Sequence, residues 1–193
     1  MQTSVPIQVK ANGYHTIDAE KHFIVTTTHG FRLHQINGCT LVKNCVEIPG
    51  GLSLCQSYRN SNIFFVVGTG ANLEWPRNKL FIWNDEEKRI VSELEFFAPI
   101  VDLKVVHGWI LVAQEDKVMI FNFEGIGMTQ AATQEFSTSI NKRGLIDLHA
   151  DDDGATFVVP YDKKKGHALV VFVPYHGRPQ ERIRDVCKDY HNY

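Results

Sequence analysis

Three adjacent carboxylates, in Asp151-Asp-Asp-Gly154, are the residues of this sequence best suited to hold a metal ion. Ca²⁺ prefers carboxylate oxygens, but a calcium-binding loop spaces them at alternate positions and closes with a bidentate Glu. The segment has neither that spacing nor the terminal Glu. The pattern favours an acidic β-turn, and we predict no metal site there.

Histidine, cysteine and serine supply the other reactive groups. His29 and His34 lack both zinc-type spacing and a nearby carboxylate. The cysteines show no Cys-x-x-Cys spacing, which favours buried apolar residues over disulfides or zinc ligands: Cys39, Cys45, Cys55 and Cys187. No Gly-x-Ser-x-Gly segment marks a nucleophile. We therefore predict no catalytic residue, no metal and no cofactor, and a protein that is not an enzyme.

Two segments could contact anions. Gly68-x-Gly70 lacks the third glycine and the following helix of a nucleotide-binding loop, so it predicts a turn. The most basic cluster is Asp162-Lys-Lys-Lys-Gly-His167. Its lysines, Lys163, Lys164 and Lys165, would each contribute about 1 kcal/mol near an anionic membrane. A solvated turn is the favoured alternative, so they are weak lipid-binding candidates.

The composition is that of an ordinary globular protein. Hydrophobic residues make up 44% of the chain and charged residues 22%, and the formal net charge is -2. This balance gives no global electrostatic reason to bind nucleic acid. No apolar run reaches the roughly 18 residues that span a bilayer, and Met1 to Lys10 does not resemble a signal peptide. We expect a cytoplasmic protein.

The elements that must position any site are β-strands. Short β-branched and aromatic runs recur between turn residues, whereas helical periodicity is almost absent. Four similar segments begin at Phe31, Leu80, Val118 and Leu169, and each follows a more apolar run and precedes a more polar one. Such an order, repeated every ~40 to 50 residues, is typical of propeller blades whose inner strands are covered on both faces.

The fold class is therefore all-β, and we predict four four-stranded antiparallel blades of a WD40-like β-propeller. The blades cover about 13–47, 51–96, 99–138 and 143–188, within a partial propeller of residues 12–193. Residues 1–11 would form a separate segment, the outer strand of a missing last blade. A β-sandwich is the alternative, since it also yields many short strands.

The second and third blades resemble one known family. Asn62-Ile-Phe-Phe-Val-Val-Gly-Thr-Gly70 and Asn78-Lys-Leu-Phe-Ile-Trp-Asn-Asp85 are similar to the second blade of the PROPPIN (WIPI) family, and Ser92-Glu-Leu-Glu-Phe96 and Asn141-Lys-Arg-Gly-Leu145 continue the likeness. The resemblance covers roughly residues 14 to 175. It implies seven blades in the whole protein, so this chain corresponds to the first four, and we expect the chain alone to need a complementary C-terminal half.

The same resemblance implies a function. PROPPINs bind phosphatidylinositol 3-phosphate (PI3P) and phosphatidylinositol 3,5-bisphosphate through an Arg-Arg-Gly motif between blades 5 and 6, and this chain contains no Arg-Arg pair. A histidine that helps form one lipid pocket corresponds at best to His191. The resemblance thus implies a non-enzymatic autophagy scaffold, peripheral on phagophore, endosomal or vacuolar/lysosomal membranes. The alternative is a cytosolic WD-repeat scaffold without lipid binding.

One loop is a candidate protein-binding site. The segment from Gly68 to Arg77 is longer than a hairpin requires, and propellers place binding residues on such loops. Pro76-Arg77 matches a pair that some PROPPINs use to engage the bridge-like lipid-transfer protein of autophagy. Arg77 would anchor a carboxylate and Trp75 would add an aromatic contact. The alternative is a solvated loop with Trp75 folded onto its own blade.

Overall fold

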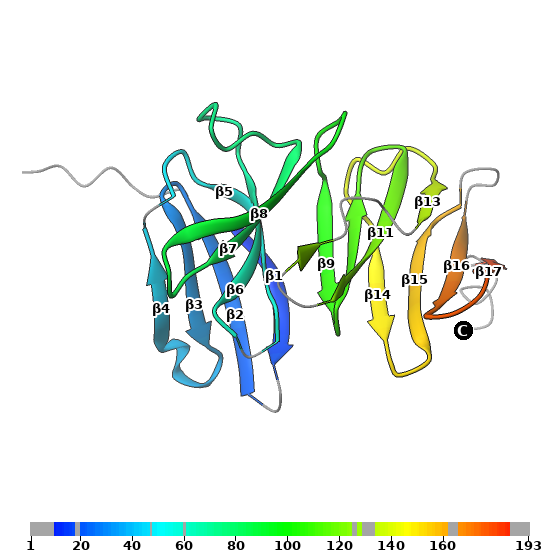
Figure 1. The fold of residues 1–193 in the computed structure, drawn as a ribbon, viewed down its shortest axis with the longest axis horizontal. Coiled ribbons are helices and arrows are strands. Elements are labelled where there is room, and N and C mark those ends of the chain that lie inside the picture. The colour runs from blue at the N-terminus through cyan, green and yellow to red at the C-terminus, as the bar shows by residue number, and fades with distance from the viewer. Residues whose placement is uncertain are drawn as a thin grey trace, which may run out of the picture. The chain divides into compact units, whose positions relative to one another are not determined.

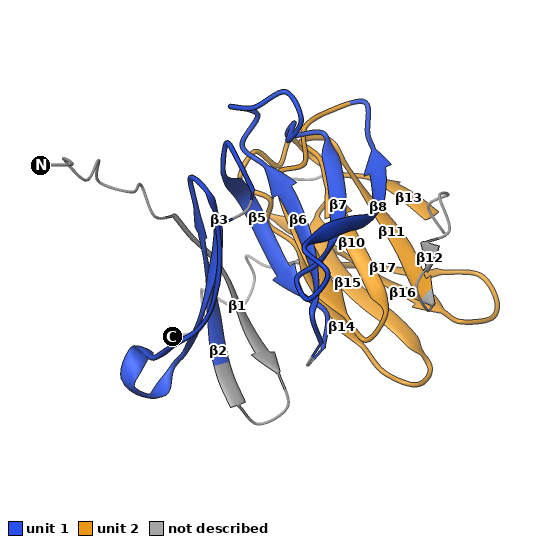
Figure 2. Cartoon of the chain, turned by 60° about the vertical axis from the view of Figure 1, so that its left-hand side comes forward, with its two compact units in different colours: residues 1–97 blue, residues 98–193 orange. Residues whose placement is uncertain are grey.

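The computed structural model describes residues 10–17, 20–46, 48–59, 61–124, 127–128, 134–161 and 166–185. These residues form antiparallel β-strands and one short 3₁₀ helix, Asn37–Cys39 (Figure 1). The all-β class and the four-stranded blades are confirmed. The chain divides into two compact units, residues 1–97 and 98–193 (Figure 2).

The first unit contains two sheets, each of four strands in sequential order. Their strands are β1 (Lys10–Ile17), β2 (Glu20–Thr27), β3 (Gly30–Gln35) and β4 (Leu41–Cys45), then β5 (Leu52–Ser57), β6 (Ile63–Gly68), β7 (Lys79–Asn84) and β8 (Arg89–Glu95). Every connection within a sheet joins neighbouring strands, as in a β-meander.

Apolar side chains from both sheets of this unit form one core. The rings of Phe31 and Phe64 lie 4.4 Å apart between centroids and join β3 to β6. The other buried members of the cluster are Ile24, Leu33, Cys45, Ile48, Leu52, Cys55, Val66, Trp75, Phe81 and Trp83. Residues 64–68 of β6 are buried on both faces, as the apolar run of that strand predicts.

The second unit is built in the same way. Its strands are β9 (Asp102–Val106), β10 (Trp109–Ala113), β11 (Lys117–Glu124), β12 (Gly127–Met128) and β13 (Gln134–Ser137), then β14 (Asp147–Ala150), β15 (Gly154–Pro160), β16 (His167–Pro174) and β17 (Gln180–Asp185). β11 pairs with both β12 and β13, so one sheet carries an additional two-residue strand.

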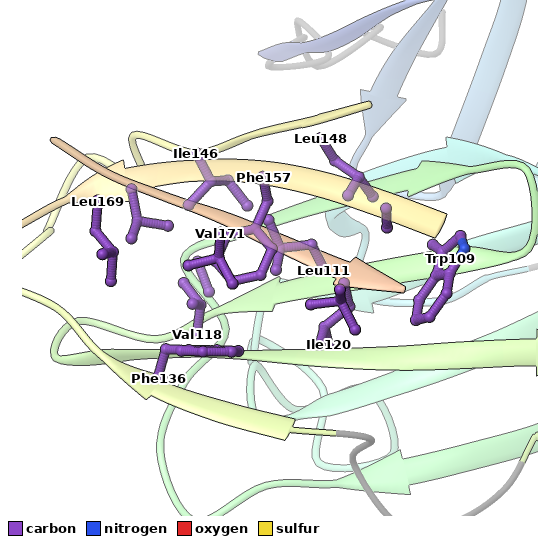
Figure 3. Packing of buried hydrophobic residues seen from close by; sticks show 14 of the residues in the cluster. Trp109, Leu111, Val118, Ile120, Phe136, Ile146, Leu148, Phe157, Leu169 and Val171 are labelled. Atoms are coloured by element: carbon purple, nitrogen blue, oxygen red, sulfur yellow. The ribbon is translucent and has the colours of Figure 1, made fainter. Parts of the chain in front are cut away.

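Residues of β10, β11, β13, β14, β15 and β16 form the core of the second unit, shown in Figure 3. Phe136 and Phe157 meet edge to face with their ring centroids 5.1 Å apart. Alternate residues of β15 are buried, so Phe157 faces this core whereas Val158 is only half-buried. Two sheets thus share one apolar layer.

Turn residues affect the start of two strands. β1 begins at Lys10, and a register shift between Ala11 and Tyr14 absorbs the turn residues Asn12-Gly13. β14 begins at Asp147, after a turn at Gly144. Gly144 has a φ of 62° and donates its N–H to the Asn141 carbonyl, so this part of the chain is a turn.

Candidate partner-binding site

The loop between β6 and β7 is held by its own hydrogen bonds. The Gly70 N–H donates to the Trp75 carbonyl (3.1 Å), and the Trp75 N–H donates to the Asn72 carbonyl (3.1 Å). The Asn72 side-chain oxygen also accepts the Glu74 N–H at 2.9 Å. Internal bonds of this kind give a ten-residue connection one defined shape.

The loop is also fastened to the segment that links the two sheets of its unit. Thr69 Oγ1 donates to the Gly50 carbonyl at 2.6 Å, and the Thr69 N–H donates to the Gly51 carbonyl at 3.2 Å. A Cβ on Gly50 would lie 2.5 Å from the Asn72 Cβ, so the two backbones meet closely. The base of the loop therefore rests on a second backbone segment.

Trp75 is part of the core. Only 5% of its surface is exposed, and its ring centroid lies 4.7 Å from that of Phe81 and 6.4 Å from that of Trp83. The expectation that Trp75 offers an aromatic contact to a partner is wrong for this conformation. Burial of its large apolar surface stabilises the blade more than exposure would, and the ring anchors the loop.

Pro76 and Arg77 follow this anchor and differ from it in exposure. Pro76 is half-buried and Arg77 is exposed. The stem of Arg77 passes over Gly70, where a Cβ would lie 3.2 Å from the Arg77 Cγ. Among the described residues no carboxylate forms an ion pair with Arg77. Its guanidinium can therefore pair with a carboxylate of another molecule.

Two exposed apolar side chains at or near this loop were not predicted from the sequence as binding residues. Leu73 is 96% exposed at the loop, and Phe97 is fully exposed just after β8. The Phe96 N–H donates to the Asn78 carbonyl (2.8 Å) and the Asn78 amide donates to the Phe96 carbonyl (2.9 Å), so the chain before Phe97 lies against the end of the loop. Leu73 could have been predicted as a binding residue, because it is a large apolar residue within a polar loop.

The main electrostatic feature of this unit is the buried carboxylate of Asp85, which directly follows β7. Asp85 accepts hydrogen bonds from Trp83 Nε1 (3.1 Å) and Lys88 Nζ (2.9 Å), and Lys43 Nζ lies 2.9 Å from its other oxygen. Burial by itself raises the pKa of Asp85, but these donors outweigh it and hold the pKa below its usual value. Asp85 thus stays ionised and ties β4 to β7.

The other polar candidates are structural. The Asp151 side chain accepts the N–H groups of Asp153 (3.0 Å) and Gly154 (3.2 Å), which is an Asx-type turn between β14 and β15. His29 Nδ1 lies 2.9 Å from the Thr28 hydroxyl, whereas His34 stacks on Phe23. In the described ranges no group of three or more His, Cys, Asp or Glu residues could hold a metal ion.

The cysteines of the described residues carry free thiols. Cys45 and Cys55 are buried, and Cys39 is exposed. Burial raises the pKa of the Cys55 thiol well above its usual value, and the nearby Cys45 and Asp85 add to the shift. Cys187 lies outside the described residues. Within the described ranges, no helix has the length and apolar character needed to cross a membrane.

Several known proteins are similar to this chain in sequence and in fold. No family model matches the chain. It is 28% identical over 126 residues to autophagy-related protein 18e of Arabidopsis thaliana. The aligned region covers 64% of this chain and 32% of that protein. It is 27% identical over 139 residues to SVP1-like protein 2 of Pichia angusta, covering 72% and 38%.

The solved structure of Hsv2 from Kluyveromyces lactis, a PROPPIN, superposes with a TM-score of 0.70 at 17% identity, covering 91% of this chain and 49% of Hsv2. The chain resembles these PROPPIN homologues in sequence and Hsv2 in fold. It spans about a third of the length of the two curated relatives and about half of Hsv2. Because the sequence identity to Hsv2 is low, this superposition shows a shared fold and nothing about function.

The PROPPIN residues expected to contact lipid fall outside the described part of the chain. Lys163, Lys164 and Lys165 belong to the undescribed range 162–165, and His191 to the range 186–193. Of the predicted protein-binding residues, the structure brings Trp75, Pro76 and Arg77 together with Leu73 in a single loop, with only Trp75 turned into the core.

Proposed function

We propose that this chain is part of a PROPPIN-type, non-enzymatic scaffold in autophagy that holds protein partners at the loop of residues 69–78. The observation that supports this most is the exposed Arg77 on a hydrogen-bonded loop that also exposes Leu73, with Phe97 exposed just after β8. A relative named as autophagy-related supports the cellular process.

The arrangement has the physical properties of a binding site. Arginine and aromatic residues supply much of the binding energy in protein interfaces. A loop that is already ordered loses little conformational entropy when a partner binds. The fitting ligand is a segment with a carboxylate for Arg77 and apolar side chains for Leu73 and Phe97. The bridge-like lipid-transfer protein of autophagy is the partner that we propose.

We further propose that the whole protein is recruited to membranes containing PI3P or PI(3,5)P2, as a peripheral protein of phagophore, endosomal or vacuolar membranes. The family's Arg-Arg headgroup motif does not occur in these 193 residues. Lipid recognition would therefore rest on another segment of the protein, and this chain would contribute protein contacts.

The test is a double substitution of Pro76 and Arg77 by Ala in the full-length protein. We expect loss of the partner in pull-down, with flotation on PI3P liposomes unchanged, because the loop is remote in sequence from the lipid motif. Arg59→Ala is the matched control, since Arg59 is an exposed arginine at the turn between β5 and β6. Retention of the partner by the double variant would refute the proposed site.

The same flotation assay separates the alternative function. A cytosolic WD-repeat scaffold without lipid binding would retain the partner and fail to float on any phosphoinositide liposome. Selective flotation of this chain alone would instead place a lipid site within residues 1–193.

A further inference from the structure

Thr69 fastens the base of the loop of residues 69–78 through its hydroxyl. Thr69 Oγ1 donates to the Gly50 carbonyl at 2.6 Å and accepts the Ala71 N–H at 3.1 Å. The Thr69 N–H also donates to the Gly51 carbonyl at 3.2 Å. One side-chain oxygen therefore joins the loop to the segment that links the two sheets, and it also shapes the first turn of the loop.

The same hydroxyl lies close to the cation of the loop. Thr69 directly precedes Gly70, and a Cβ on Gly70 would lie 3.2 Å from the Arg77 Cγ. Thr69 and Arg77 are both exposed. A group attached to Thr69 Oγ1 would thus come near a guanidinium that forms no ion pair within the described ranges.

We propose that Thr69 is a phosphorylation site and that its phosphate switches off partner binding at the loop, an inference that rests on the proposed function. In this reaction Thr69 Oγ1 attacks the γ-phosphorus of a nucleoside triphosphate held by a protein kinase. The bond between that phosphorus and the nucleoside diphosphate breaks, and the hydroxyl proton passes to the base of the kinase. The products are phosphothreonine and the nucleoside diphosphate.

The phosphate acts on the loop in two ways. It removes the donor that the Gly50 carbonyl now has at 2.6 Å, and phosphate and carbonyl oxygens repel each other, so the base of the loop separates from the linking segment. Its oxygens also accept charge-assisted hydrogen bonds from the Arg77 guanidinium. Arg77 is then no longer available to a carboxylate of the partner.

Ser61 provides a matched control within the same sheet. In the turn between β5 and β6, Ser61 Oγ donates to the Tyr58 carbonyl at 2.5 Å and accepts the Ile63 N–H at 3.2 Å. This exposed hydroxyl has the same two hydrogen-bonding roles as that of Thr69. It lies at the other end of β6, so its phosphorylation should leave the loop unchanged.

Binding of the full-length protein to the immobilised bridge-like lipid-transfer protein tests the switch. We expect phosphothreonine at position 69 to weaken binding at least about 30-fold, and Thr69→Val, which loses only the hydroxyl, about five-fold. Thr69→Ser and phosphoserine at position 61 should bind as the unaltered protein does. All four proteins should float on PI3P liposomes, which shows that they are folded. Unchanged binding with phosphothreonine at position 69 would overturn the switch.

The same assay separates this inference from the proposed function. If the double substitution of Pro76 and Arg77 by Ala abolishes binding while phosphothreonine at position 69 leaves it intact, the proposed site stands and only the switch is wrong. If the double variant binds the partner fully, both are wrong.

Mass spectrometry tests whether the modification occurs in cells. The tryptic peptide of residues 60–77 contains two hydroxyl side chains, those of Ser61 and Thr69, so it compares the site with its control directly. We expect phosphate on Thr69 and none on Ser61, in a larger fraction of the protein when autophagy is suppressed. A peptide without phosphate on Thr69 in both autophagy-active and autophagy-suppressed cells would refute the modification.

Discussion

At the scale of single residues, the most consequential side chain is Asp85. Its side chain is 3% exposed and still ionised, because Lys43, Lys88 and Trp83 direct their donors at it. A buried charge of this kind stabilises the fold only while its partners are present. The Trp83-Asn-Asp85 segment therefore acts as a link between β4 and β7, not as a reactive site.

Replacement of Asp85 by Asn should lower the free energy of unfolding by about 2 to 4 kcal/mol, since Lys43 then faces a neutral amide. Urea unfolding followed by tryptophan fluorescence measures the change. Glu93→Gln is the control: Glu93 is half exposed and bonded to Lys79 at 3.1 Å, so its loss should change stability by less than about 1 kcal/mol. Equal effects of the two substitutions would contradict the role of Asp85.

The pH dependence of this contribution has a definite sign. The folded-state pKa of Asp85 is lower than that of an unfolded aspartate, about 3.9. Its stabilisation is therefore fully present above about pH 4 and is lost as the pH falls through the folded-state value. The stability difference between the unaltered chain and Asp85→Asn should shrink on acidification in urea titrations. A difference that stays constant down to pH 2 would show that charge is not its origin.

At the scale of the element, the loop of residues 69–78 requires a glycine at position 68. A Cβ on Gly68 would collide with the Trp75 carbonyl oxygen. Gly68→Ala should displace the loop, weaken partner binding and cost about 1 to 3 kcal/mol of stability, as overpacking does. Ala71→Ser, at an exposed position of the same loop, should leave both unchanged. Partner pull-down and thermal unfolding measure the two effects, and a fully stable, partner-binding Gly68→Ala would contradict this account.

At the scale of the whole molecule, each unit depends on an apolar layer between two sheets. Phe157 is 1% exposed in the layer of the second unit, whereas Val158 on the same strand is half-buried on the other face. Phe157→Ala should cost about 3 to 5 kcal/mol, and Val158→Ala less than about 1.5 kcal/mol. Hydrogen exchange of β14 to β17 should accelerate in the first variant and barely change in the second. Similar exchange in both would show that the layer does not hold the second unit together.

The sequence by itself determined the all-β class and the blades, and it carried the resemblance to the PROPPIN family. Recurring β-branched and aromatic runs and apolar inner strands are local properties, so they can be recognised without the fold. The loop of residues 68–77 was also recognisable, because it is too long for a hairpin between two clear strands.

Only the tertiary structure decided which side chains of that loop are exposed. Trp75 is buried because Phe81 and Trp83 lie on the next strand at ring-contact distance, whereas no residue in the described ranges covers Leu73 or Phe97 in this way. The direction of Lys43 was equally hidden in the sequence. It turns inward because Asp85 and Asn62, both distant in the chain, lie beside its ammonium.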